Sequence, residues 1–247
     1  MPCPGGRLQP VAIAICAVAA SIGFSGRVLA AGAAYQVDTA DVSEVGSCKV
    51  ESWISSAGNN DVIASVSPAC VVGMFRPVEV SAQFTRARAD EEWGTSVTPK
   101  LKTNIVPTAI GSWGVAISAT AAFDLLTNEN TALFVTVPAT LRLSNVVRIN
   151  VNAGWQLDRT VNRNYFTYGA GFDWRTPDNV WTLTGEVFGQ AGVAEQTGVV
   201  EPRFQLGLRY RPIDLFNVDL IYGRNLAGER ANWITLATVI RFKPQEK

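Results

Sequence analysis

The sequence predicts an all-β protein: an antiparallel up-and-down transmembrane β-barrel of about 12 strands, preceded by a signal peptide. Three observations predict this fold. Apolar and polar residues alternate with a period of two in one segment after another. The segments are about 9–13 residues long, which is enough to cross a bilayer as tilted strands. Short turns also alternate with longer, more polar loops along the chain, as in barrels whose turns all lie on one side of the membrane.

The first thirty residues (1–30) have the organisation of a signal peptide. An apolar stretch over residues 11–24 follows Arg7, and a small-residue cleavage site ends at Ala30. We therefore expect export, with cleavage near Ala30. The alternative is a single membrane anchor, but the apolar stretch is short and Arg27 interrupts its far side. No uninterrupted apolar run in the sequence reaches the roughly 18 residues of a spanning helix.

Residues 31–46 lie between the cleavage site and the first predicted strand. They are mostly small, carry acidic side chains and show no clear period. We expect them to form a flexible periplasmic leader. The alternative is that they enter the barrel, where their acidic side chains would meet basic groups.

The barrel itself is expected over residues 47–242, with a tail at 243–247. It divides into segments rich in β-branched and aromatic residues that are bounded by Gly, Pro, Asn or Asp. The predicted strands cover residues 47–56, 62–72, 77–87, 93–106, 113–123, 131–143, 146–157, 164–174, 179–189, 202–211, 215–224 and 232–242.

The alternation is clearest in the seventh segment. Over residues 147–158 one face carries Val, Ile, Ala, Trp and Leu, and the other carries Arg, Asn, Gly, Gln and Asp. A membrane barrel turns the apolar face to lipid, whereas a soluble β-sandwich turns it inward. Strand length and loop alternation favour the membrane barrel, and a soluble β-sandwich remains the alternative. Aromatic residues near strand ends suit an interfacial girdle: Trp93, Trp113, Trp155, Tyr165, Trp174, Trp181, Tyr210, Tyr222 and Trp233.

Two cysteines of the mature chain form a candidate disulfide. Cys3 and Cys16 lie in the expected signal peptide, which leaves Cys48 and Cys70. Their midpoint, position 59, falls in a strong turn sequence, so a hairpin closed there would bring the two cysteines opposite each other. Export makes oxidation possible. The alternative is a pair of reduced thiols packed on an apolar face.

The chemistry of the sequence argues against an enzyme. It contains no histidine, the side chain most used for acid–base catalysis and the commonest transition-metal ligand. No phosphate-binding loop, cysteine-pair metal site or nucleophile elbow occurs. We therefore expect no catalytic residue, metal or cofactor. With 21 basic and 21 acidic side chains, nothing points to nucleic acid.

The expected lumen face is charged. By strand alternation it carries nine basic residues, namely Lys100, Lys102, Arg142, Arg148, Arg175, Arg203, Arg209, Arg211 and Arg241. Its six acidic residues are Glu51, Glu79, Asp158, Asp173, Glu186 and Asp219. An arginine-lined passage would favour anionic solutes. The candidate pore-lining residues are Arg142, Arg148, Arg175, Arg203, Arg209, Arg211, Asp173, Glu186 and Asp219. The alternative is that these ions pair across strands and fill a narrow barrel.

Three features carry a resemblance to known barrels. The predicted strand number and the arginine-bearing lumen resemble the small monomeric porins for acidic sugars and oligouronides. The runs from Trp174 to Trp181 and from Gly207 to Pro212 are similar to proteobacterial outer-membrane transport barrels, including the group linked by name to phenol degradation. The last segment ends on Phe242 and resembles the C-terminal assembly signal of outer-membrane barrels, although five residues follow it.

The resemblance implies an outer-membrane channel for passive passage of small, anionic solutes. The expected partners are outer-membrane lipid, the barrel assembly machinery and the solutes themselves; the oligomeric state stays open. The alternative is a non-conducting structural or interaction barrel of the outer membrane. No functional residue is carried over from the resemblance.

Overall fold

The computed structural model describes residues 34–89, 91–192, 202–226 and 231–243. They form twelve antiparallel β-strands: β1 (Cys48–Ala57), β2 (Val62–Gly73), β3 (Pro77–Ala89), β4 (Glu92–Val106), β5 (Trp113–Asp124), β6 (Asn130–Arg142), β7 (Val147–Asp158), β8 (Arg163–Arg175), β9 (Trp181–Gly192), β10 (Arg203–Ile213), β11 (Phe216–Asn225) and β12 (Asn232–Phe242).

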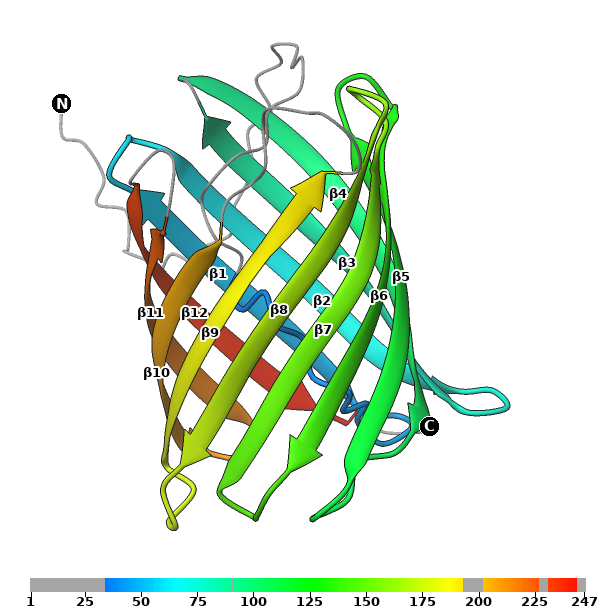
Figure 1. Cartoon of the computed structure of the whole chain (residues 1–247), viewed down its shortest axis with the longest axis vertical. Helices are drawn as coiled ribbons and strands as arrows, with labels where there is room; N and C mark the ends of the chain where they lie inside the picture. Colours follow the sequence, from blue (N-terminus) through cyan, green and yellow to red (C-terminus); the bar gives the residue numbers. More distant parts are fainter. Residues whose placement is uncertain (1–33, 90, 193–201, 227–230, 244–247) are drawn as a thin grey trace, which may run out of the picture.

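The strands close into an up-and-down barrel, as Figure 1 shows. Each strand pairs with its sequence neighbours, and β1 closes the sheet by pairing with β12 from Cys48↔Phe242 to Ala57↔Trp233. The predicted fold class and all twelve strands are confirmed, with bounds that differ by a few residues. In the part of the chain that the structure describes, we find no helix with the length and apolar character needed to cross a bilayer.

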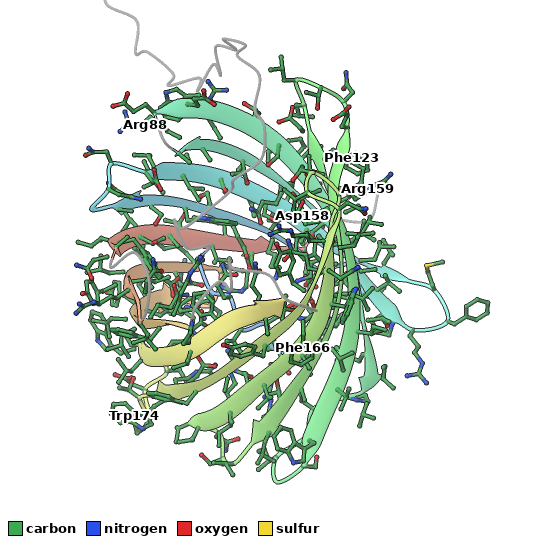
Figure 2. All side chains as sticks on the ribbon, turned by 45° about the horizontal axis from the view of Figure 1, so that its top comes forward. Arg88, Phe123, Asp158, Arg159, Phe166 and Trp174 are labelled. Carbon is green, nitrogen blue, oxygen red and sulfur yellow. A yellow bond between two sulfur atoms is a disulfide. The ribbon has the colours of Figure 1, made fainter. Side chains whose placement is uncertain are left out.

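The outer surface of the barrel is apolar, as a lipid-facing wall requires. Phe166 and Trp174 of β8, both labelled in Figure 2, are 44% and 48% exposed. Seven of the nine aromatic residues expected in a girdle are similarly exposed. The expectation was wrong for Tyr165 and Trp233, which are 8% and 1% exposed. Both have the parity of the inward face, and Trp233 occupies the space that a side chain at Gly223 would need.

The connections define two ends of the barrel. Short connections, such as 143–146 between β6 and β7 and 176–180 between β8 and β9, lie at the end where β1 begins and β12 finishes. The longest connection, 193–202 between β9 and β10, lies at the other end, although 107–112 between β4 and β5 makes one turn-end connection longer than several at that end. In an outer-membrane barrel the short turns are periplasmic. We therefore call the two ends the turn end and the loop end.

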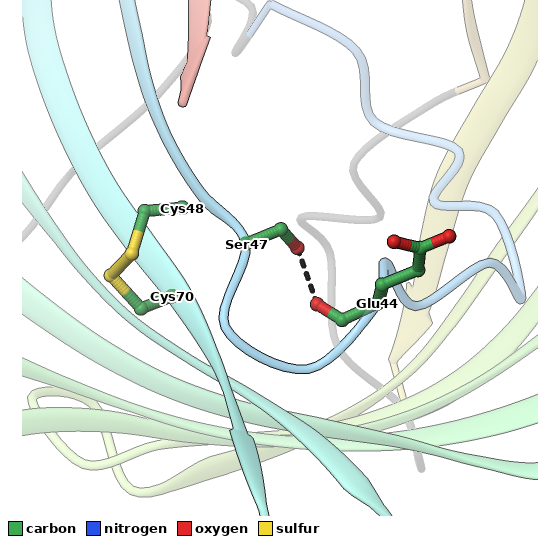
Figure 3. The surroundings of a disulfide bond; sticks show 4 residues. All are labelled: Glu44, Ser47, Cys48 and Cys70. Carbon is green, nitrogen blue, oxygen red and sulfur yellow. Dashed lines mark hydrogen bonds between the residues drawn. A yellow bond between two sulfur atoms is a disulfide. The ribbon is translucent and has the colours of Figure 1, made fainter. Parts of the chain in front are cut away.

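The Cys48–Cys70 disulfide joins β1 to β2 at the turn end (Figure 3). The two cysteines are register partners, as the turn centred on position 59 predicted. Beside them, the Ser47 hydroxyl donates a 2.5 Å hydrogen bond to the Glu44 carbonyl, and the Gly46 amide donates to the Val71 carbonyl over 2.9 Å. These bonds fix the chain where it turns from the barrel wall into the interior.

Residues 34–41, which we call the lumen segment, lie inside the barrel. Figure 1 shows this stretch in blue, running within the ring of strands. The expectation that residues 31–46 form a flexible periplasmic leader was therefore wrong over residues 34–41. The physical reason is that the acidic side chains and backbone of this stretch bind polar groups of the wall. The expected signal peptide and its cleavage near Ala30 lie outside the described residues and stay predictions.

Candidate functional site: the barrel lumen

The backbone of the lumen segment is held by side chains of the wall. The carboxylate of Glu186 on β9 accepts hydrogen bonds from the amides of Gln36 and Val37, at 2.7 and 3.1 Å. In the amide orientation that satisfies both partners, Asn152 of β7 donates to the Asp38 carbonyl over 2.8 Å and accepts from the Asp38 amide over 2.6 Å. These contacts give an otherwise irregular backbone the partners that a buried chain needs.

The backbone of Ala40 is also held by wall side chains, here from β4 and β6. Its amide donates to the Thr140 hydroxyl over 2.8 Å, and its carbonyl accepts from the Asn104 side-chain amide. Thr140 is itself fully buried and also donates to Asn150. The lumen segment is therefore bound to strands on several sides of the barrel, not to one wall.

Tyr35 packs flat against β10. Its hydroxyl donates to Asp219 of β11 over 3.1 Å, and the Arg209 guanidinium lies 5.4 Å from its ring centroid. Arg209 also donates to Asp219 over 2.7 Å. The ring can approach the wall because Gly207 has no side chain: a Cβ there would lie 2.3 Å from the Tyr35 hydroxyl oxygen.

Val37 supplies an apolar contact of the lumen segment with the wall. It belongs to a small buried cluster with Ala57, Phe188 and Trp233. Gly169 and Gly171 of β8 make room for it, since an ideal Cβ at Gly169 would lie 2.8 Å from a Val37 methyl group. The wall is thus shaped to the side chains of the segment as well as to its backbone.

Asp38 lies between two ammonium groups of β4. Lys100 and Lys102 approach its two carboxylate oxygens at 2.6 and 2.7 Å. Burial by itself would raise the pKa of Asp38, but the two lysines outweigh burial and hold that pKa below its ordinary value. Asp38 is therefore ionised throughout the physiological range and neutralises part of the basic wall.

Asp41 has the same arrangement with two arginines. Arg142 of β6 and Arg148 of β7 both reach its Oδ2, at 3.0 and 3.1 Å, while the Thr108 hydroxyl donates to Oδ1 over 2.5 Å. Burial alone would raise the pKa of Asp41, and the Thr108 hydrogen bond and the two arginines hold it below its ordinary value. Each aspartate carboxylate of the lumen segment thus binds two cationic side chains of the wall.

The three acidic residues predicted to line the pore, Asp173, Glu186 and Asp219, are also bound. Asp173 is buried and accepts from Arg148, Asn150 and Thr184. Asp219 accepts from Arg209, Tyr35 and Asn217, and Glu186 also accepts from Gln205 over 2.5 Å. These three side chains lie inside the barrel, and each accepts hydrogen bonds from neighbouring side chains or from the lumen segment.

The predicted arginines divide into two groups. Arg142, Arg148 and Arg209 bind carboxylates, as above. Arg175 and Arg211 lie at the turn end, where their contacts are longer. Arg175 donates to the Asn179 side chain over 3.5 Å, and Arg211 donates to the Asn179 carbonyl over 3.3 Å and lies 3.9 Å from Asp214. Arg203 is half-buried at the loop end of β10. At the turn end, Arg175 and Arg211 thus have no acidic group within 3.5 Å among the described residues.

Two cavities lie inside the barrel, and the first of them adjoins the lumen segment. One of about 510 Å³ lies between the segment and the wall, and a second of about 620 Å³ lies at the turn end. Lys49, Glu79 and Arg241 line both of them. The wall of the first is rich in small hydroxyl side chains from β2 to β6, namely Ser67, Ser81, Thr98, Ser118, Thr120 and Thr136.

Sequence reasoning assigned the lumen-facing residues of the strands but missed the residues opposite them. The binding partners in the segment are Tyr35, Asp38 and Asp41. The available signal was charge complementarity: an acidic stretch precedes a barrel whose expected interior carries more basic than acidic residues.

Comparisons with known proteins agree with this architecture. The family model described as "Uncharacterised conserved protein UCP029691" matches residues 19–242. No curated protein matches the sequence.

Three solved structures are similar. The KdgM porin in complex with disordered oligogalacturonate has a TM-score of 0.61 at 8% identity, covering 78% of this chain and 99% of that one. The NanC porin has a TM-score of 0.61 at 8% identity, covering 77% and 98%. The COG4313 outer membrane channel from Pseudomonas putida F1 has a TM-score of 0.60 at 13% identity, covering 84% and 100%. At these identities the likeness establishes the fold, and it confirms the resemblance to small porins at that level.

Proposed function

The chain belongs to the family described as "Uncharacterised conserved protein UCP029691", and from the geometry of its lumen we propose that it is a channel of the bacterial outer membrane for passive passage of small solutes. Outer-membrane lipid would contact its apolar outer wall, and the barrel assembly machinery would insert it. The porins and the channel to which it is similar share its fold, which supports this assignment.

The observation that carries the proposal is a polar route beside the lumen segment. The two cavities share Lys49, Glu79 and Arg241, so they adjoin along the β1, β3 and β12 side of the barrel. Hydroxyl groups and charged side chains line this route, which suits a hydrated solute that exchanges water for protein hydrogen bonds as it passes.

We assign the preference for anions to the turn end. Around the 510 Å³ cavity the wall has five basic and five acidic residues, and Asp38 of the lumen segment adds one further negative charge. The basic residues are Lys49, Lys100, Arg148, Arg209 and Arg241, and the acidic ones are Glu51, Glu79, Asp173, Glu186 and Asp219. Arg175 and Arg211 add positive charge at the turn end, where the guanidinium fork can bind carboxylate or phosphate.

Ion selectivity in planar bilayers tests this proposal. The double variant Arg175→Ser with Arg211→Ser should keep the wild-type conductance within about a factor of two and lose most of its anion preference in a salt gradient. These two positions are better targets than Arg148 and Arg209, whose removal would leave Asp173 and Asp219 with a buried charge and one partner fewer. Arg224→Ser, on the outward face of β11, is the matched control. Unchanged selectivity in the double variant would overturn the assignment to the turn end.

A second function is favoured by the lumen segment itself: a plugged barrel that supports the envelope or presents its loops to partners. The segment occupies the middle of the barrel and binds strands on several sides. Bilayer recordings separate the two functions. A barrel plugged by the segment gives no channel events with the wild-type chain and gains them only in a chain that lacks residues 31–41, whereas the channel gives defined conductance steps with the wild-type chain already.

A further inference from the structure

Each acidic side chain of the lumen segment is held by a matched pair of cations on the wall. Asp38 takes both ammonium groups of the lysine pair, Lys100 and Lys102. Asp41 takes the arginine pair, Arg142 and Arg148. Neither pair is exposed at the outer surface, and the Lys102 side chain is only 4% exposed.

We propose that these two cation pairs are binding sites for the acidic groups of a linear dicarboxylate, and that the lumen segment is a tethered competitor that occupies them. The inference rests on the proposed channel function, because a solute must enter the lumen to reach the sites. It adds the class of solute and the way in which the chain itself regulates access.

The geometry of the segment sets the size of the ligand. Residues 38 and 41 are three positions apart, and an extended chain of three residues spans at most about 10 Å. A solute with two carboxylates up to about that distance apart can reach both pairs at once. Carboxylates are the matching groups because the side chains that fill the sites in the structure are themselves carboxylates.

The electrostatics predict that the solute and the lumen segment compete for the cation pairs and do not bind them at the same time. If the segment left the wall with nothing in its place, Lys100, Lys102 and Arg142 would lose the acid that they bind and Arg148 would keep only Asp173, which is costly in a partly buried site. A dicarboxylate that replaces Asp38 and Asp41 keeps every cation paired. The exchange is therefore close to balanced in charge, and the hydrogen bonds of the Asp38 and Ala40 backbone to Asn152, Thr140 and Asn104 favour return of the segment when the solute leaves.

The remaining contacts of the segment allow this exchange to be reversible. Glu186 holds the Gln36 and Val37 amides, and Tyr35 binds Asp219. These contacts involve neither cation pair. They can retain the start of the segment at the wall while the stretch that carries Asp38 and Asp41 moves aside.

Calorimetric titration of the folded, detergent-solubilised barrel with hexanedioate tests the proposal. The double variant Asp38→Asn with Asp41→Asn removes the competing charges and should bind hexanedioate at least tenfold more tightly than the wild type. The double variant Glu44→Gln with Glu129→Gln changes the net charge equally but at exposed sites, and it should bind as the wild type does. Acetate, with a single carboxylate, should bind at least tenfold more weakly than hexanedioate to every protein.

Affinities that agree within twofold among the three proteins would overturn the proposal, as would acetate binding as tightly as hexanedioate. Bilayer conductance of the same samples keeps the two hypotheses apart. Tighter binding without channel events contradicts the channel function and retains the two sites, whereas channel events without tighter binding contradict the sites and retain the channel.

Discussion

The Tyr35 hydroxyl donates a 3.1 Å hydrogen bond to the Asp219 carboxylate and so joins residues 184 positions apart. The contact depends on a third residue, Gly207, because any side chain there would occupy the space of the Tyr35 ring. Tyr35, Asp219 and Gly207 thus couple the start of the lumen segment to the middle of β10 and β11.

Gly207→Ala should loosen the lumen segment without disturbing the lipid-facing wall. The added methyl group would displace Tyr35, at a cost of about 1–3 kcal/mol for an overpacked contact. A spin label on Thr39→Cys, a position that faces the 510 Å³ cavity, should become more mobile in this variant. Gly192→Ala is the matched control, since nothing lies within 4 Å of a Cβ there. Equal label mobility in both variants would contradict the role assigned to Gly207.

Binding of the lumen segment should weaken in acid. The pKa values of Asp38 and Asp41 lie below their ordinary value of 3.8, because the lysine and arginine pairs favour the charged forms. A lowered pKa gives stability that is complete above the ordinary pKa and is lost as the pH falls through the bound-state value. The label at position 39 should therefore stay immobile from pH 8 to about pH 4 and gain mobility below that.

The control for the acid effect is the Asp38→Asn, Asp41→Asn double variant, which lacks both titrating groups. Its label spectrum should show no such step between pH 5 and about pH 2. A transition of equal size in this variant would assign the acid effect to other carboxylates of the barrel.

The sequence was sufficient to predict the barrel because the relevant signal is local. Alternation along β7, from Val147 to Asp158, fixes which side chains face lipid and which face the lumen, and the turn around position 59 fixes the register of Cys48 and Cys70. Charged residues such as Arg148 and Asp173 were assigned to the correct face for the same reason, since a period of two leaves only two choices.

The position of the lumen segment could not be obtained in this way. Residues 34–41 have no period, and their partners lie about 60 to 180 positions away, as with Asp38 and Lys100 or Tyr35 and Asp219. Trp233 shows the same limit: its aromatic ring suited an interfacial girdle, and its burial depends on space left by Gly223 on the neighbouring strand. Such contacts are set by tertiary packing.

A covalent lock should show whether the lumen segment moves during conduction. The Val37 Cβ lies 3.6 Å from the ideal Cβ position at Gly171, which is within the usual range for a disulfide. The double variant Val37→Cys with Gly171→Cys should form a crosslink on oxidation, and the oxidised channel should conduct as the reduced one does, because the exchange at Asp38 and Asp41 leaves residue 37 at the wall. The wild type under the same reductant is the control, because its Cys48–Cys70 bond is reduced too. A lower conductance in the oxidised form would mean that residue 37 itself leaves the wall during conduction, which contradicts retention of the start of the segment.

The Cys48–Cys70 disulfide should stabilise the barrel at its closing seam. β1 pairs with β12 on one side and with β2 on the other. The disulfide therefore crosslinks the strand that closes the barrel to its neighbour. Closing a chain loop of 22 residues is worth about 3 kcal/mol in the chain-entropy model. The double variant Cys48→Ser with Cys70→Ser should therefore lose its compact form at a lower temperature, measured as the midpoint of the heat-induced mobility shift on a denaturing gel. A midpoint equal to that of the oxidised wild type would contradict a stabilising role, and reduced wild type should match the variant.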